Sequence, residues 1–224
     1  MKQKIYDFKK NKINLFSQER LKSYSLQEDK KDIEIQLKRH NNNLNLIQRI
    51  TKDLALIEIG TRNLLDFYMK EKYKNDDWIN QEAQNSSEFK IIIDKIKKRY
   101  GNLILNNNQL LSNLTIGQIT KIIREKDALN IIFDFKNINL KKYYFKNKNR
   151  YKNRRPISKK HKADIILSLL VNIRNRSFHW ENLTKLRDDG IPRLSVENKG
   201  IYTTIEPDKI ETFLKDILNE IYKE

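Results

Sequence analysis

The stretch Asn172–Leu183, NIRNRSFHWENL, closes the most apolar segment of the chain, which begins at Ala163. Isoleucine, leucine and valine recur through this segment at the spacing of a buried helix, and Ser158 stands where a side chain can cap its start. We therefore predict a helix from about Lys159 to Arg176, and its burial in a core decides the fold.

The residues that follow this helix predict a β-hairpin and a last helix. Gly190 and Pro192 break the chain, and the hairpin then occupies residues 193–205, with a turn at Glu197–Gly200 between Arg193–Val196 and Ile201–Ile205. Pro207 is placed to open a helix that reaches about Tyr222 and carries its apolar residues on one face.

The residues that precede the helix predict further helices. Apolar residues step by three and four from Leu44 to Tyr68, which predicts a helix from Leu44 to about Tyr73. A second helix, Asp32–Asn43, would be separated from it by a break at the weak helix formers Asn41, Asn42 and Asn43. Shorter helices are predicted at 88–100, 115–124 and 128–135, with polar turns or loops at 75–87 and 102–113. Residues 1–31 form a basic N-terminal extension. The class is mainly α with a small C-terminal hairpin, in a single domain of residues 1–224, because no linker interrupts the chain.

Composition narrows the function classes. The formal net charge of +17 favours a polyanionic partner, nucleic acid first, although an AT-rich genome could account for part of the lysine excess. No cysteine is present, and no apolar run of membrane-spanning length or signal peptide is recognisable, which favours a cytoplasmic protein without membrane contact. No histidine or carboxylate pattern predicts a metal, and no glycine-rich phosphate loop predicts a cofactor.

A second basic feature is the segment 136–157. Between Lys136 and Arg155 it holds nine lysines or arginines and no acid. Arginines on such a segment can contact an RNA backbone, and tyrosines can stack on bases. The alternative is a solvated, partly disordered loop. The candidate RNA-binding residues are Tyr143, Tyr144, Arg150, Tyr151, Arg154 and Arg155.

The apolar helix carries one polar stripe along its length. At about 100° per residue, five side chains fall within roughly 80° of one another. The stripe could be a solvent-facing edge, or the floor of a groove that leads to a reactive site at its end. Its members are Asp164, Ser168, Asn172, Asn175 and His179.

Arg174, Asn175 and His179 form the candidate site at the end of that stripe. Their spacing resembles the R-N-x-x-x-H motif of HEPN-domain ribonucleases, and the run RNRSFHWENL resembles the signature of Abi-like (abortive-infection) proteins in that superfamily. The chain departs from the signature at Trp180, where relatives often have a second histidine, and at Asn182, where a proline is expected. Further blocks that resemble the family in order are Phe16-Ser17, Arg20-Leu21, Tyr24, Leu37 with Asn41, Glu58 to Asn63, and Leu114 to Gly117, with His40 in place of a tryptophan.

The resemblance implies a HEPN-type helical bundle that forms a homodimer through the motif helix. It implies metal-independent cleavage of single-stranded RNA, a role in phage defence or as a toxin, and control by a neutralising partner protein or non-coding RNA. Residues in a supporting role would be Glu58, Arg62, Asn63, Arg176 and Glu181. Glu58 and Arg62 could instead form only an intrahelical salt bridge, and Trp180 could stack on a base, although a buried core indole is the favoured expectation.

The residue types of the motif suit RNA cleavage. Histidine can transfer a proton near neutral pH, and an arginine fork can stabilise the charge of a phosphorane. Asn175 lies one helical turn before His179, so its amide could orient the ring or bond at the helix end. We therefore expect an endoribonuclease that cleaves by 2′-OH attack. The alternatives are a non-catalytic RNA-binding or regulatory HEPN module and, with less support because no helix-turn-helix stands out, a DNA-binding protein.

Overall fold

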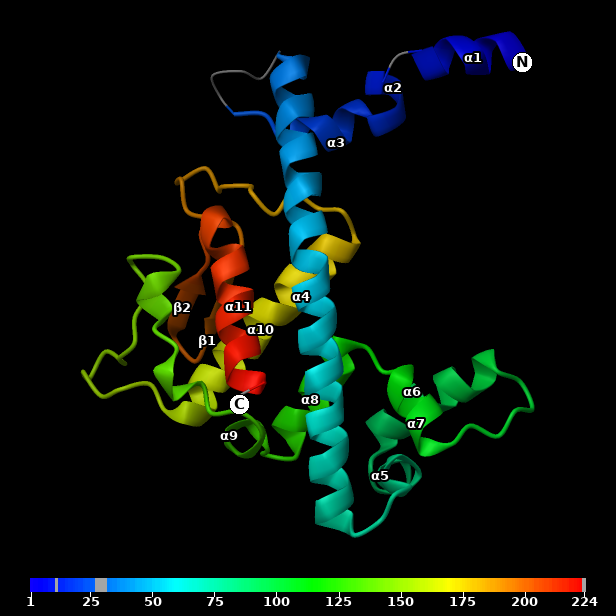
Figure 1. Ribbon diagram of the computed structural model, residues 1–224, viewed down its shortest axis with the longest axis vertical. Coiled ribbons are helices and arrows are strands. Elements are labelled where there is room, and N and C mark those ends of the chain that lie inside the picture. The colour runs from blue at the N-terminus through cyan, green and yellow to red at the C-terminus, as the bar shows by residue number, and fades with distance from the viewer. Residues whose placement is uncertain (11, 27–31, 223–224) are drawn as a thin grey trace. The chain divides into compact units, whose positions relative to one another are not determined.

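The computed structural model describes residues 1–10, 12–26 and 32–222 and is mainly helical, with one two-stranded antiparallel hairpin near the C-terminus (Figure 1). The class predicted from the sequence is confirmed at this level. Residues 11 and 27–31 of the predicted N-terminal extension lie outside the described residues. The helices of that extension are α1 (Lys2–Lys10), α2 (Lys12–Phe16) and α3 (Gln18–Lys22). No helix in the described ranges is long and apolar enough to cross a membrane.

The chain divides into two compact units, and each unit combines segments that are far apart in the sequence. Unit 1 comprises residues 1–54, 139–156 and 168–215, and unit 2 comprises residues 55–138, 157–167 and 216–224. Three helices contribute residues to both units, which is why a sequence without a linker predicts one domain. They are α4 (Ile33–Tyr73), α10 (Lys159–Phe178) and α11 (Ile210–Ile221).

Helix α4 is a single helix of 41 residues, so the predicted break at Asn41–Asn43 is wrong. Asp32 caps its start, because the Asp32 carboxylate accepts hydrogen bonds from the backbone N–H groups of Glu34 and Ile35. Asn43 is fully buried and uses its amide in tertiary hydrogen bonds. The cost of asparagine in a helix is small, about 0.6 kcal/mol relative to alanine, and such bonds outweigh it.

The hairpin of unit 1 is confirmed, but the predicted turn at Glu197–Gly200 is too long, because Glu197 and Asn198 pair with the second strand. Strands β1 (Ser195–Asn198) and β2 (Ile201–Thr204) pair antiparallel in the register Ser195–Thr204. Lys199 and Gly200 between them have φ angles of 47° and 75°, which is the backbone of a two-residue type I′ turn. After the short 3-10 helix η4 (Pro207–Lys209), helix α11 begins at Ile210.

The segment Asn139–Pro156 packs in unit 1 against the hairpin. Asn147 is buried, and its amide donates to the carbonyls of Leu140 and Thr204 and accepts from the N–H of Thr204. The Tyr143 ring meets Phe213 edge-on at 5.1 Å between centroids. These contacts make the segment an ordered layer of the core. The 3-10 helix η3 (Leu140–Lys142) lies within it.

Unit 2 contains two helices that the sequence predicts as turn or loop. Helix α5 (Trp78–Asn85) buries Trp78 completely, and the Trp78 indole donates to Asp66 at 2.8 Å. Helix α7 (Asn107–Ser112) starts with a capping box between Asn106 and Gln109. The other elements of this unit are α6 (Ser87–Arg99), α8 (Ile116–Glu125), α9 (Leu129–Ile132) and η2 (Phe135–Asn137).

Candidate functional site

The motif lies on the last turn of α10, and a Schellman motif ends the helix there. Trp180 donates its backbone N–H to the Ser177 carbonyl at 3.1 Å, and Glu181 donates to the Arg176 carbonyl at 2.8 Å. Trp180 takes the left-handed position, with φ 56°, which glycine usually occupies. His179 is therefore the C-cap residue, placed at the very end of the helix and not within a helical turn.

The side chains of Asn175 and His179 are both exposed and lie one helical turn apart. Among the residues that the structure describes, neither the Asn175 amide nor the His179 imidazole has a hydrogen-bond partner. Arg174 is half-buried, and its guanidinium lies over the Phe178 ring at 4.7 Å from the centroid. The imidazole is thus open to a ligand, and the Arg174 guanidinium lies against an aromatic ring.

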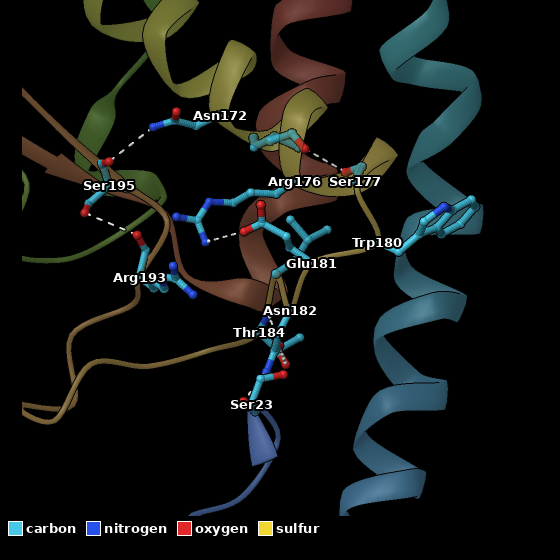
Figure 2. A network of polar contacts seen from close by, with 12 residues as sticks. Ser23, Asn172, Arg176, Ser177, Trp180, Glu181, Asn182, Thr184, Arg193 and Ser195 are labelled. Atoms are coloured by element: carbon cyan, nitrogen blue, oxygen red, sulfur yellow. Dashed lines mark hydrogen bonds and ion pairs between the residues drawn. The ribbon is translucent and has the colours of Figure 1, made fainter. Parts of the chain in front are cut away.

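Arg176 points to the other side of the helix end, toward the hairpin (Figure 2). Its guanidinium lies 3.7 Å from the Glu181 carboxylate. Burial, followed by the positive charge of Arg193, lowers the pKa of the Arg176 guanidinium from its ordinary value, and Glu181 opposes that shift. Arg176 and Glu181 are therefore neighbours, and both face a positively charged region.

Trp180 does not lie in the core. Its side chain is 54% exposed, so the expectation of a buried indole is wrong. The prediction that this ring stacks on a base is untested. Its backbone is held from the N-terminal region, because the Arg20 guanidinium donates to the Trp180 carbonyl at 2.5 Å.

Two buried asparagines fix the loop that follows the helix. The Asn43 amide donates to the Glu181 carbonyl at 3.0 Å and to the Tyr24 hydroxyl at 3.1 Å, and its oxygen accepts from the Leu183 N–H at 2.8 Å. Asn182 donates to the Ser23 carbonyl at 2.7 Å. This loop, with its contacts to α4 and to the chain after α3, holds the position of His179.

The polar stripe of α10 is mostly structural. In unit 2, Asp164 forms an ion pair with Arg124 at 2.5 Å. In unit 1, Asn172 donates to the Ser195 carbonyl of β1 at 3.4 Å. The groove-floor interpretation therefore fails for these two residues, and exposure in the stripe begins only at Asn175.

The supporting residues Glu58, Arg62 and Asn63 belong to unit 2. Glu58 and Arg62 form the intrahelical ion pair that their spacing allows, with 3.4 Å between Nη2 and Oε1, and both side chains are largely buried. Asn63 is exposed. The more specific prediction, that Glu58 positions Arg62 or Arg174 beside the reactive site, is untested.

The basic segment separates into a buried part and an exposed part. Tyr143 is fully buried and Tyr144 is 8% exposed, so the prediction that these two rings stack on bases is wrong. Tyr151 is half-buried. The exposed part is a tight turn in which Tyr151 N–H donates to the Arg155 carbonyl and Arg150 reaches the Arg154 carbonyl. Its three arginines are exposed, and RNA binding by them stays a prediction: Arg150, Arg154 and Arg155.

Only one of the three histidines is exposed. His40 in unit 1 is 2% exposed and packs against the rings of Phe16 and Tyr24. His161 in unit 2 is 4% exposed. Burial, with a smaller contribution from Arg20, lowers the pKa of His40 from its usual value. Neither buried ring can exchange a proton with a ligand on the surface, so His179 is the one histidine available for that role.

Sequence reasoning missed the residues that position the motif. Asn43 lies in step with Ile47, Ile50 and Leu54 on the buried face of α4, and that register is the signal that could have identified it. Arg20 and Asn182 gave no comparable signal, because their partners lie 160 and 159 residues away in sequence. The chain matches no protein-family model, no curated protein and no solved structure.

Proposed function

We propose that this protein is a metal-independent endoribonuclease of the HEPN type, resembling Abi-like proteins, that cleaves single-stranded RNA as a phage-defence or toxin-type nuclease. One observation carries the proposal. The exposed imidazole of His179 has no hydrogen-bond partner within the described residues, and Arg174 and Asn175 stand on the turn that precedes it. The net charge of +17 supports a polyanionic substrate.

The reaction needs no group beyond those of the motif. The 2′-hydroxyl of a ribose loses its proton to a base and attacks the adjacent phosphorus. A new 2′-O–P bond forms, the bond to the 5′-oxygen breaks, and that oxygen takes up a proton. His179 acts as base or acid, and Arg174 stabilises the charge of the phosphorane. Asn175 orients a phosphate oxygen or the imidazole from the same face of the helix.

The active species in this proposal is a homodimer. The transfer uses one base and one acid, whereas each chain exposes a single histidine. A two-fold axis beside the end of α10 brings the His179 of two copies into one cleft through an isologous interface. Such a composite site also gives a neutralising partner protein or RNA one place at which to block both chains.

The test is cleavage of labelled single-stranded RNA with and without EDTA. The wild-type protein should cleave in both conditions, whereas His179→Ala and Arg174→Ala should lose cleavage and keep the wild-type far-UV circular dichroism spectrum. Lys215→Ala is the control, because Lys215 is an exposed lysine on α11. If His179→Ala cleaves at the wild-type rate, the catalytic role is refuted. Tight RNA binding without cleavage by the wild-type protein would instead identify a binding or regulatory module.

A further inference from the structure

Unit 1 gathers three arginines from separate turns of the chain beside the motif. Arg176 ends α10, whereas Arg187 and Arg193 lie in the bend before β1, where Leu186 and Pro192 form an isolated bridge. The backbone of Arg193 is fixed by its N–H, which donates to the Lys185 carbonyl at 2.9 Å. The bend therefore holds two arginines close to the end of the motif helix.

Polar contacts through Ser195 organise this cluster. The Arg187 guanidinium donates to the Ser195 hydroxyl at 2.6 Å and lies 5.3 Å from the centroid of the Tyr202 ring. Tyr202 donates to the same hydroxyl at 2.8 Å, and Asn172 of α10 donates to the Ser195 carbonyl. Figure 2 shows Asn172, Arg176, Arg193 and Ser195 on one side of the helix end. The arginines are therefore placed by hairpin and helix together.

The positive charge of the cluster is poorly compensated. Glu181 is the one acid that pairs with any of the three arginines in the described part of the chain, and it lies 3.7 Å from Arg176 and is half-exposed. Glu197 faces the same side of the hairpin as Tyr202, and Asp188 and Asp189 follow Arg187 in sequence, yet none of these acids forms an ion pair with the cluster there. The guanidinium of Arg193 has no partner within those residues.

The Arg176 guanidinium lies in the positive field of the other two arginines. Burial and the charges of Arg193 and Arg187 both lower the pKa of Arg176. Arginine presents a planar fork of donors that fits a phosphate, and bonds of this kind to an anion are about twice as strong as neutral ones. Placing three such forks together with a single paired carboxylate, that of Glu181, favours an external anion as the partner.

We propose that Arg176, Arg187 and Arg193 form a subsite that binds a backbone phosphate of single-stranded RNA next to the phosphate at His179. Arg176 lies on the last turn of α10, three residues before His179, and points to the hairpin side of the helix end, whereas His179 is exposed at the C-cap. A strand that lies across the helix end therefore meets both. The subsite rests on the proposed function for RNA as its ligand, but it does not need His179 to be catalytic.

Binding of a fluorescein-labelled single-stranded RNA by anisotropy tests the subsite. The measurement uses the His179→Ala background, in which the probe stays intact. Arg187→Gln with Arg193→Gln should weaken binding by about tenfold or more and reduce the slope of log affinity against log salt by about 0.7, the loss of one phosphate contact. The matched control is Lys38→Gln with Lys52→Gln, which removes the same charge from exposed positions of α4.

The control variants distinguish a specific subsite from general electrostatic attraction. Equal effects of the arginine pair and the lysine pair would overturn the subsite. Arg193→Lys keeps the charge and should still weaken binding, because it loses the fork. Arg193→Gln alone covers the case in which the double variant does not fold, since its guanidinium contacts no other side chain by hydrogen bond or ion pair within the described residues.

The cleavage assay separates this proposal from the proposed function. With an otherwise wild-type chain, Arg187→Gln with Arg193→Gln should raise KM and leave kcat within about twofold, because uniform binding is lost and the reacting atoms are untouched. A fall of kcat with unchanged KM would contradict the subsite. Absence of cleavage by every chain, with the arginine effect on binding retained, would refute the nuclease and leave the subsite standing.

Discussion

Replacing Asn43 by alanine should destabilise unit 1, because one buried amide makes three hydrogen bonds. Asn43 is 0% exposed and bonds with Tyr24, Glu181 and Leu183. The buried Leu183 N–H loses its acceptor, which costs about 1–3 kcal/mol, and two further bonds are worth about 1 kcal/mol each. Alanine returns about 0.6 kcal/mol through helix propensity. The expected net loss is about 2–4 kcal/mol.

Urea unfolding and thermal melts followed by far-UV circular dichroism measure this loss. For a chain of this length, the midpoint should fall by roughly 5–15 °C. Asn42→Ala is the matched control, because Asn42 is the exposed neighbour on the same helix and gains the same propensity. That variant should be unchanged or slightly more stable. If Asn43→Ala lies within about 0.5 kcal/mol of Asn42→Ala, the amide does not hold the loop after the motif, and the reasoning is refuted.

Four further predictions use other features of the chain. Replacing Arg150, Arg154 and Arg155 of the basic turn together by glutamine should weaken RNA binding, measured by anisotropy, and should flatten the salt dependence of that binding. An unchanged salt slope would indicate a solvated loop. Tagged heterodimers of wild-type and His179→Ala chains should keep far less than half of the wild-type activity per dimer, since independent sites would keep half. Trp180→Gly should match or exceed the wild-type melting temperature, because glycine removes a left-handed cost of about 1–2 kcal/mol, and a lower temperature would mean that the indole packs. Burial and Arg20 lower the pKa of His40, so the stability linked to this group is present above its unfolded pKa of 6.5 and is lost as pH falls below that value. The melting temperature should therefore decline from about pH 7.5 to about pH 5, and His40→Phe should flatten that decline.

The elements predicted well are those that local sequence defines. Helix α10 starts where Ser158 accepts from the His161 N–H, and the hairpin forms around a two-residue turn with Gly200. The missed helices α5 and α7 lack an apolar period. Helix α5 is held by Trp78, whose indole bonds to Asp66, a residue on a different helix. Helices fixed by one tertiary anchor leave little periodic pattern to read.

The residues of the candidate site also divide into those that local sequence places and those that tertiary contacts place. Arg174, Asn175 and His179 are close in sequence, so a short motif is enough to place them together at the end of one helix. Burial of Tyr143 against Phe213 could not be predicted, because a tyrosine in a basic run looks the same whether its ring faces a base or another core ring. The arrangement of Arg176 with Arg193 depends on where the bend before β1 returns, and no local pattern encodes that return.

The exposed rings beside His179 bear on how two copies would meet. Phe178 and Trp180 flank His179 in sequence and are 48% and 54% exposed, although both are large apolar side chains. Burial of exposed apolar area contributes about 25 cal/mol per Å², so an interface that covers these rings has a driving force beside the histidine. An isologous interface that covers these rings buries them on both copies, and it brings the two imidazoles toward the same axis. In the proposed dimer, the Trp180 ring would therefore supply contact area, and the second histidine would come from the other chain.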